Sequence, residues 1–476
     1  MGAPHRPVSP LIEPDVAGRV LRAALRSGAA FAEVFAEDER SMAAALDEGG
    51  VEEVTSGRDR GAGVRVVAGG TTGFAHTADL SERGLLAAAR VAAEVAGSSS
   101  GPVAAVRRGP EATPRRFERA PAGVDPEHTQ KAAKVALLAA AADAAYAVSG
   151  SISQVLARYG DNRRRILVAN SDGVLVEDEQ VRTVFSVACI ATRDGETASG
   201  NQGIGHSGGF ELFDGHGVAA LAREAARQAV AKLGATPAPS GSLPVVFGGG
   251  GGGVLLHEAC GHGLEADLVA RGASVFADRR GSRVASPLLT LADDATLARG
   301  WGSFAIDDEG LPARRTVLIQ DGVLSDYLYD RLRARRDGRA RSANGRRESY
   351  QHLPLVRMSN VVADAGRSSR DDIIAGTGRG VYVVQLDAGE VNTATGDFVF
   401  GITEAYAIER GRITRPLREG SVVGNSLEVL RRIDAVGDDV GIGAPATCDK
   451  DAQRVPVGDA VPTLRVASMT ISGTVR

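Results

Sequence analysis

HEACGHGLEAD, residues 257–267, is the stretch of this chain that says most about its fold and its chemistry. His257 and His262 bracket Glu258, which directly follows the first histidine. Imidazole nitrogens are good zinc ligands, and a carboxylate beside the metal can take a proton from bound water. The pattern therefore predicts a metallohydrolase. For so short a motif, the alternative is a satisfied histidine–glutamate pair in an apolar core.

The spacing of the two histidines predicts an irregular helix. In the common zinc-peptidase helix the histidines stand four residues apart on one face, whereas here they stand five apart. Five residues of an ideal α-helix rotate by about 500°, so the two imidazoles would point about 140° apart. Gly261 tolerates a distorted backbone, and a π-bulge or an early helix end there would turn His262 towards His257. A regular α-helix through His262 would contradict the metal hypothesis.

The third ligand is left open by the spacing. The chain has three cysteines, Cys189, Cys260 and Cys448. Cys189 lies in a strand-like run and is expected in the core, because an unpaired cysteine usually behaves as a small buried hydrophobe. Cys260 lies inside the motif and Cys448 lies far along the chain. Either thiolate, with the fourth position left open, would suit a catalytic zinc.

Composition sets the broad class. The 476 residues suffice for two or three domains, and 43% hydrophobic and 24% charged residues are ordinary for a globular protein. A net charge of −4 gives no general attraction to nucleic acid or acidic membranes. Three scattered cysteines argue against a disulfide framework. The first residues lack a signal-type apolar segment and no run of about 18 apolar residues occurs, so a cytoplasmic location is expected.

Loop-like composition divides the chain into five parts. They are an N-terminal α/β segment (1–97), a linker (98–124), a central α/β segment (125–234), a second linker (235–241) and a β-rich segment with the histidine motif (242–476). Strands and helices mix in every segment, and 60 glycines favour turns and β-structure. The predicted fold class is therefore α+β.

Periodicity and turn residues place the main elements of the first two segments. Helices are expected at 15–28, from a capping box of Asp79 and Glu82 to Ala96, from Asp125-Pro126-Glu127 onwards, and at 218–233. Strands are expected at 31–37, 62–68, 72–76, 152–158, 165–169, 173–177 and 182–191.

Two biased runs invite functional interpretations. Gly248–Gly253 is six glycines between a strand and the motif, where nucleotide phosphates can bind, but no Lys-Ser/Thr follows. The favoured interpretation is a backbone that lies close to something else, with three possibilities: helix packing, a mobile loop or an extended substrate. Residues 331–347 hold eight arginines. Most such charge runs are solvated, so a mobile loop is expected in the first part, while Arg346 and Arg347 are candidates to clamp a substrate carbonyl or carboxylate.

The chain resembles the TldD/PmbA family of zinc metallopeptidases, specifically its TldD-like, catalytically competent branch. The resemblance covers nearly the whole chain in the same order. It rests on LLHEACGHGLE (255–265), NGRRESY (344–350), LP (353–354), RMSN (357–360), FVF (398–400), EAY (404–406), CDK (448–450), VPVG (455–458) and PTLRV (462–466). It implies an N-terminal α/β region followed by a C-terminal β-rich catalytic region.

The resemblance also implies roles and partners. Zinc would be held by His257, His262 and Cys448, with Glu258 as the general base. Family members cleave unfolded peptides and help to mature some ribosomally made peptides. The competent member pairs with a homologous chain that lacks the metal motif, so a heterodimer, or else a homodimer, is expected. An older description of the family as a modulator of DNA gyrase supplies the alternative of a non-catalytic regulatory subunit.

Two features depart from the family pattern. Gly248–Gly253 replaces a mixed glycine, proline and aromatic stretch, and Cys260 stands where a small aliphatic residue is expected. The resulting prediction is a zinc-dependent peptidase for unfolded or extended peptides, without a nucleic-acid or membrane partner. The intact set of His257, Glu258, His262 and Cys448 argues against the regulatory alternative, because an inactive relative would be expected to have lost at least one of them.

Overall fold

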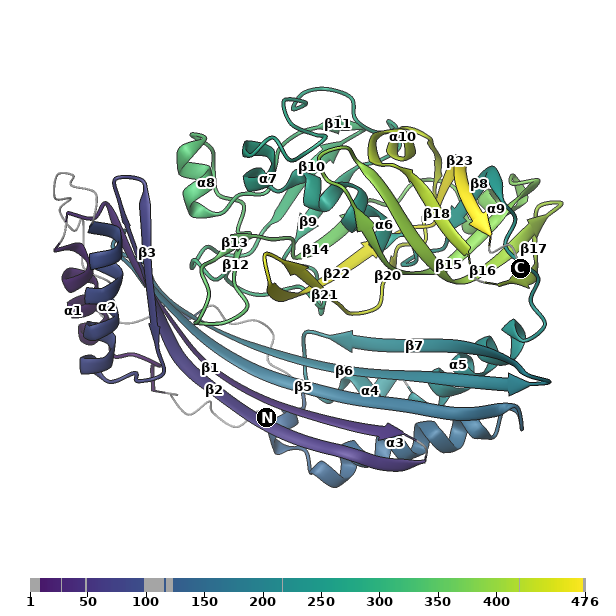
Figure 1. Cartoon of the computed structure of the whole chain (residues 1–476), viewed down its shortest axis with the longest axis horizontal. Coiled ribbons are helices and arrows are strands. Elements are labelled where there is room, and N and C mark those ends of the chain that lie inside the picture. The colour runs from purple at the N-terminus through teal and green to yellow at the C-terminus, as the bar shows by residue number, and fades with distance from the viewer. Residues whose placement is uncertain are drawn as a thin grey trace.

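The computed structural model describes residues 9–26, 28–47, 49–97, 115–116, 123–215, 217–418 and 420–473. Two lobes make up the molecule (Figure 1). The sheet lobe, residues 9–234, is a long curved sheet with helices on its outer side. The C-terminal lobe, residues 235–473, is β-rich and lies on the concave side of that sheet. The predicted α+β class is confirmed. Most of the predicted 98–124 linker lies outside the described residues.

A single seven-stranded sheet joins the first and second predicted segments. Its order is β3-β2-β1-β5-β6-β4, with β7 also pairing β6. The strands are β1 (Phe31–Asp47), β2 (Gly50–Ala68), β3 (Thr71–Thr77), β4 (Arg115–Arg116), β5 (Ile152–Asn170), β6 (Leu175–Arg193) and β7 (Glu196–His206). β1 pairs antiparallel with β2 on one side and with β5 on the other. Strands from both segments therefore share one backbone hydrogen-bond network.

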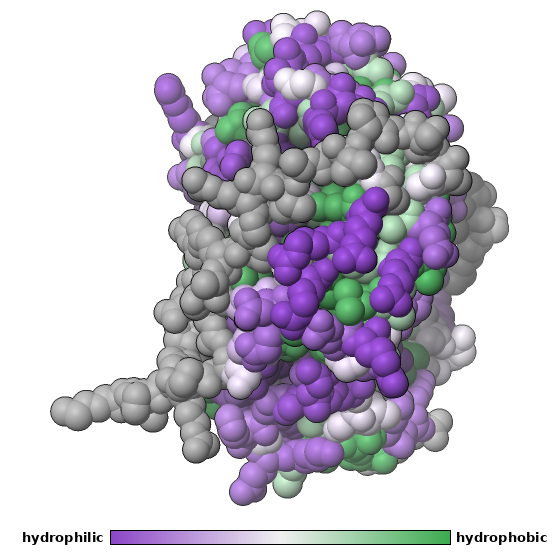
Figure 2. Space-filling view, turned by 90° about the vertical axis from the view of Figure 1, so that its left-hand side faces the viewer, coloured by the Kyte–Doolittle hydropathy of each residue, from purple (hydrophilic) through white to green (hydrophobic). Residues whose placement is uncertain are grey.

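Four helices cover the two ends of the sheet with separate cores. They are α1 (Pro14–Leu25), α2 (Glu82–Gly97), α3 (Lys131–Tyr146) and α5 (Val218–Lys232); a single turn, α4 (Leu212–Gly215), precedes α5. One apolar cluster lies under α1 and α2, and a second lies under α3 and α5. Figure 2 looks onto the α1–α2 end, where hydrophilic side chains cover most of the coloured surface. Both helices thus bury one side and present the other to solvent, as an amphipathic pattern requires.

Several strands are longer than the sequence predicts. The predicted pairs 152–158 with 165–169, and 173–177 with 182–191, are the single strands β5 and β6. Charged residues interrupt the apolar alternation in the middle of β5, and this hid its continuity. Arg163 contacts Glu127 and Glu179, and Arg164 contacts Glu37 and Asp308. Ion pairs therefore replace apolar packing between the two cores.

Two predicted helix starts are displaced. Asp125 caps only a short 3₁₀ turn, Pro126–His128, by accepting a hydrogen bond from the Glu127 amide, and α3 begins at Lys131. At α2 the cap is Ser81, whose hydroxyl accepts from the Gly84 amide, rather than Asp79.

The C-terminal lobe contains two seven-stranded sheets and a two-stranded ribbon. One sheet has the order β11-β10-β9-β14-β22-β20, with β21 also on β22; the other has the order β15-β8-β23-β18-β16-β17, with β19 on β23, and closes through β15–β16. The strands are β8 (Gly241–Phe247), β9 (Leu291–Asp294), β10 (Arg315–Gln320), β11 (Val323–Leu324), β12 (Gly345–Arg346), β13 (Leu355–Val356), β14 (Asn360–Ala363), β15 (Arg379–Val391), β16 (Asp397–Glu409), β17 (Arg412–Leu417), β18 (Gly420–Asn425), β19 (Ile433–Val436), β20 (Gly441–Ile442), β21 (Ala446–Lys450), β22 (Gln453–Val461) and β23 (Leu464–Gly473).

Short helices connect these strands. They are α6 (Gly253–Leu256), the π-helical turn η2 (His257–Gly261), the 3₁₀ turn η3 (His262–Leu264), α7 (Ala266–Ala270), α8 (Arg331–Arg336), α9 (Arg370–Ala375) and α10 (Ser426–Arg431). The expectation of a mobile loop at the start of the arginine run is wrong. Asp330 caps α8 there, and Arg331 is buried against Phe31 and Asp172. Within the described ranges, no helix is both long and apolar enough to cross a membrane.

Buried ion pairs fasten the two lobes together. We call this set the interlobe charge network; it comprises Glu33, Glu37, Arg65, Arg164, Asp308, Glu309 and Arg347. Glu33 accepts from Arg65 at 2.9 Å and from Arg347 at 2.7 Å. Arg65 also donates to Glu309 at 2.7 Å. Arg347 is therefore a structural residue, and the prediction that it clamps substrate is wrong.

Candidate metal centre

The predicted helix irregularity at the histidine motif is confirmed. α6 gives way at His257 to the π-helical turn η2, and the 3₁₀ turn η3 begins at His262. Gly261 has ordinary right-handed helical dihedrals, so positive φ is not the reason for a glycine there. A Cβ at Gly261 would lie 2.1 Å from the sulfur of Met358. A side chain at this position would displace the Met358 side chain that packs against the turn, so packing favours glycine there.

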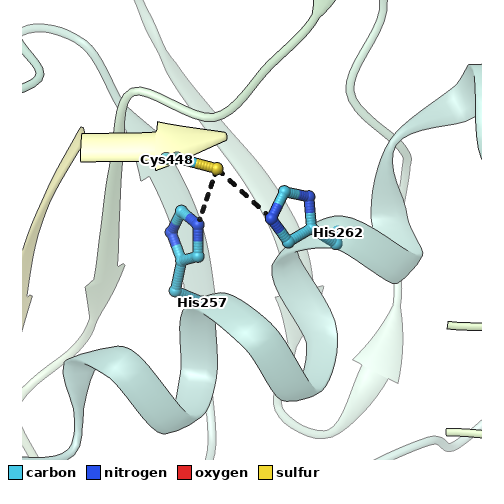
Figure 3. Close-up of side chains that lie close together, drawn as sticks. All are labelled: His257, His262 and Cys448. Carbon is cyan, nitrogen blue, oxygen red and sulfur yellow. Dashed lines mark hydrogen bonds between the residues drawn. The ribbon is translucent and has the colours of Figure 1, made fainter. Parts of the chain in front are cut away.

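Three side chains from two distant parts of the chain converge at this turn (Figure 3). The Sγ of Cys448, on β21, lies 3.4 Å from Nε2 of His257 and 3.3 Å from Nε2 of His262. The two imidazole planes are at 87° with centroids 5.1 Å apart. All three residues are buried, and their ligand atoms lie within 4.8 Å of one another. In the part of the chain that the structure describes, this is the one such group.

The spacing of these atoms fits a zinc ion. Zinc bonds of about 2.3 Å to sulfur and about 2.05 Å to nitrogen, at tetrahedral angles, separate the two ligands by about 3.6 Å. The two sulfur–nitrogen distances are only slightly shorter. Two imidazoles and one thiolate would leave a fourth position for water or substrate, which is the arrangement of catalytic rather than structural zinc sites.

Electrostatics prepare the thiol for a metal. Burial raises the pKa of the Cys448 thiol, but hydrogen bonds and charges from His257 and His262 outweigh this effect and lower it to about 5. Burial lowers the pKa of His262, yet the neighbouring Glu265 carboxylate and Cys448 raise it well above 6.5. The centre thus pairs a thiolate with an imidazolium. The thiolate is the form of cysteine that binds metals, and His262 must release its Nε2 proton before that nitrogen can bind one.

Glu258 lies beside the converging atoms and reaches solvent. Its Oε2 is 3.9 Å from Nε2 of His262, and 24% of its side chain is exposed. A carboxylate next to the ligand atoms and open to water can exchange protons with a substrate at the centre.

Cys260 is separated from this group. Its thiol donates to the carbonyl oxygen of Leu256 at 2.9 Å, and burial raises its pKa to about 12. Cys189 is in the apolar core beneath α3 and α5. Of the three cysteines, the structure therefore brings Cys448 alone to the two histidines.

The glycine run packs against neighbouring backbone, which is one of the three possibilities that the sequence left open. A Cβ would approach the Asp439 carbonyl oxygen to 2.5 Å at Gly249 and the Val384 carbonyl oxygen to 2.3 Å at Gly251. At Gly253 it would lie 1.9 Å from the Asp459 carboxyl carbon. The run lets the segment before the motif sit directly on β15 and on the loop around β20. Packing therefore accounts for the glycines at these positions.

Four residues around the centre were not identified from the sequence. Glu265 accepts from Nδ1 of His262 at 3.0 Å, and Lys450 donates to Glu265 at 2.9 Å. Arg357 donates to the carbonyl oxygen of Cys448 at 2.5 Å, and Trp301 donates to that of Ala446 at 3.0 Å. The one feature of the sequence that could have indicated any of them is the spacing of Glu265, which stands three residues after His262. Arg346, predicted to clamp substrate, is instead buried and donates to the Met358 carbonyl oxygen.

Comparison with family models matches almost the whole described chain. The PmbA/TldA metallopeptidase domain 1, central domain and C-terminal domain match residues 32–96, 124–233 and 240–473. The chain belongs to the PmbA/TldD metallopeptidase family.

Curated members of the family are similar over nearly their full length. A protein of Haemophilus influenzae named metalloprotease TldD homolog is 37% identical, over 93% of each chain. A metalloprotease of Methanothermobacter thermautotrophicus is 34% identical, over 97% of this chain and 100% of its own. The family resemblance stated from the sequence is confirmed, and the relatives are named metalloproteases.

Solved structures share the fold. A Thermotoga maritima protein named as a modulator of a DNA gyrase superposes with a TM-score of 0.79 at 20% identity, over 96% of this chain and 99% of its own. TldE from Thermococcus kodakarensis superposes with a TM-score of 0.79 at 18% identity, over 96% and 100%. At these identities the likeness establishes the architecture of both lobes.

Proposed function

We propose that this family member is a zinc-dependent peptidase that hydrolyses unfolded or extended peptides. The observation that carries the proposal is the convergence of His257, His262 and Cys448 within bonding range of one ion, with Glu258 beside them. The metalloprotease names of its relatives support the same reaction class.

In this proposal each residue has a distinct task. Zinc, when bound, would lower the pKa of a water to about 7 and polarise the scissile carbonyl. His257, His262 and Cys448 would hold the ion. Glu258 takes the proton from the attacking water and then delivers it to the leaving amine. Its position supports this role, because its Oε2 lies 3.9 Å from Nε2 of His262 and its side chain is partly exposed.

An extended peptide needs a strand edge near the centre. The outer carbonyls of β21 are already used, because Ala446 accepts from Trp301 and Cys448 accepts from Arg357. β20 pairs with β22 and ends its sheet, and Ile442 on it is 65% exposed. The loop around β20 contacts the glycine run that leads into the histidine motif. We therefore place the substrate along β20, where backbone pairing would give weak sequence preference.

The test combines zinc content with cleavage of an unfolded fluorogenic peptide. Glu258→Ala should abolish cleavage while zinc remains bound, and Cys448→Ala should lose zinc, because two protein ligands rarely hold it. Cys260→Ala, the matched control, should retain both. Turnover by the Glu258 variant would disprove the general-base role, and full zinc in the Cys448 variant would disprove the ligand set. Zinc binding without any turnover would favour the regulatory alternative.

The predicted partner is a homologous non-catalytic chain, which would form a heterodimer with this one. The alternative is a homodimer of two copies of this chain. The assay above should accordingly be run with this chain alone and with a family member that lacks the histidine motif. Cleavage that requires the second chain would support the heterodimer.

A further inference from the structure

The geometry points to Lys450 as a positioning residue of the metal centre, acting through Glu265 on His262. The inference rests on the proposed function, because it concerns how the protein presents its zinc ligands. It is independent of which peptide is cleaved. Lys450 does not contact the converging ligand atoms; it reaches them through one carboxylate.

Two different backbone periods bring the four residues together. Cys448 and Lys450 stand two apart on β21, so their side chains leave the same face of the strand. His262 and Glu265 stand three apart across a 3₁₀ turn, whose period of three residues aligns them. The strand therefore meets the turn at two points: Cys448 at His262, 3.3 Å, and Lys450 at Glu265, 2.9 Å. The two contacts, together with the backbone from Cys448 to Lys450 and from His262 to Glu265, form a closed ring.

The ammonium group of Lys450 is fully used inside this ring. Its three protons go to Glu265 at 2.9 Å, Asp267 at 2.9 Å and the carbonyl oxygen of Val356 at 3.0 Å. Only 8% of the side chain is exposed. A lysine with no free proton and almost no exposure is suited to hold neighbouring groups and not to bind substrate.

Glu265 depends on Lys450. Its side chain is completely buried, and its Oε2 receives both His262 and Lys450. Its Oε1 has no hydrogen-bond partner among the described residues. Without Lys450 the buried carboxylate would retain one polar partner, which is an unfavourable state for a charge. Its reorientation would release Nδ1 of His262.

The Glu265 contact decides which His262 nitrogen can bind a metal. A carboxylate that accepts from Nδ1 keeps the proton there and leaves Nε2 free, and such partners typically change metal affinity 10- to 100-fold. Nε2 is the nitrogen that faces Cys448. Cys448 and His262 are 186 residues apart in the sequence. Lys450 thus links the strand that carries Cys448 to the turn that carries His262, and so helps to hold both metal ligands in place.

The test measures zinc affinity by chelator competition on the full chain. Lys450→Met and Glu265→Gln should each bind zinc about 10- to 100-fold more weakly. The matched control is Lys134→Met, which removes another buried lysine, paired with Asp161 at 2.6 Å in the sheet lobe. It should lower thermal stability and leave the zinc affinity within twofold. Cobalt in place of zinc adds a second readout, because the thiolate–cobalt absorption band reports the geometry of Cys448.

The outcomes are distinct. Weaker zinc binding and an altered cobalt band in folded Lys450→Met, with neither change in Lys134→Met, would support the positioning role. Wild-type zinc affinity in a folded Lys450 variant would overturn it while leaving the proposed function intact. If Lys450→Met fails to fold, Glu265→Gln decides by the same two readouts. An unmutated chain that binds neither metal would overturn the proposed function and this inference together.

Discussion

Replacing Glu33 by glutamine should loosen the joint between the two lobes. Glu33 lies on β1 and accepts from Arg65 at 2.9 Å and from Arg347 at 2.7 Å. Both arginines and the glutamate are buried. The amide would keep one acceptor oxygen but turn an N–H group towards the other guanidinium. One buried arginine would then face a donor instead of an anion.

The expected cost is large for a single atom exchange. Breaking a buried ion pair by removing one partner typically costs about 3–5 kcal/mol. That corresponds to about two to four orders of magnitude in the unfolding equilibrium. Arg65 retains Glu309 at 2.7 Å, while the Arg347 guanidinium retains two carbonyl acceptors and the face of the Phe35 ring. Most of the loss should therefore arise at Arg347.

Urea unfolding followed by tryptophan fluorescence is a suitable assay, because the chain has one tryptophan and it reports on both lobes. Trp301 donates to Ala446, and its carbonyl oxygen accepts from Arg182 on β6. The control is Glu224→Gln, which removes an exposed pair with Arg227 and should leave the midpoint unchanged.

The double variant Glu33→Gln/Arg347→Met should be less destabilised than the sum of the single changes, because it leaves no unpaired charge at that contact. An unchanged midpoint for Glu33→Gln, or full additivity in the double variant, would refute the role assigned to this pair.

Burial raises the pKa of Glu33, but Arg65 and Arg347 outweigh it and hold that pKa below 4.5 in the folded state. The stability that Glu33 contributes should therefore be lost as the pH falls below about 4.5. Glu33→Gln should show a shallower loss over the same acid range in urea titrations. Gly253→Ala should cost about 1–3 kcal/mol in urea unfolding, since the new methyl would meet the Asp459 carboxyl group. Gly378→Ala, where an added Cβ would have nothing within 4 Å, is the control and should leave the midpoint nearly unchanged. Arg357→Met should reduce zinc content, because the carbonyl oxygens of Cys448 and Gln453 both lose their buried donor; retained zinc would show that β21 holds its place without it.

Local sequence was sufficient for features that depend on neighbouring residues. The five-residue separation of His257 and His262 required an irregular turn if both were to face one point, and the chain forms π-helical and 3₁₀ turns there. For the glycine run, packing was one of three possibilities, and the run does lie against other backbone, because six residues without side chains permit such an approach. The α+β class and the family followed from periodicity and from motif order.

Features that depend on residues far apart in the chain were harder to predict from the sequence. The arginine run between Arg331 and Arg347 looked solvated, since its counter-charges, including Glu33 and Asp172, come from elsewhere in the chain. β5 was divided in two for the same reason: the charges that interrupt its apolar pattern pair across the lobes.

The sequence by itself determined the chemistry offered by the motif: two imidazoles, a carboxylate and a turn that can bring them round, all within one short segment. Tertiary structure decided which thiol accompanies them. Cys260 is next to the motif in sequence but bonds to the Leu256 carbonyl oxygen, whereas Cys448 arrives on β21 and lies beside both histidines. The reason is physical: helical geometry directs a side chain by its position in the turn, and only sheet pairing carries a residue far along the chain to the same point.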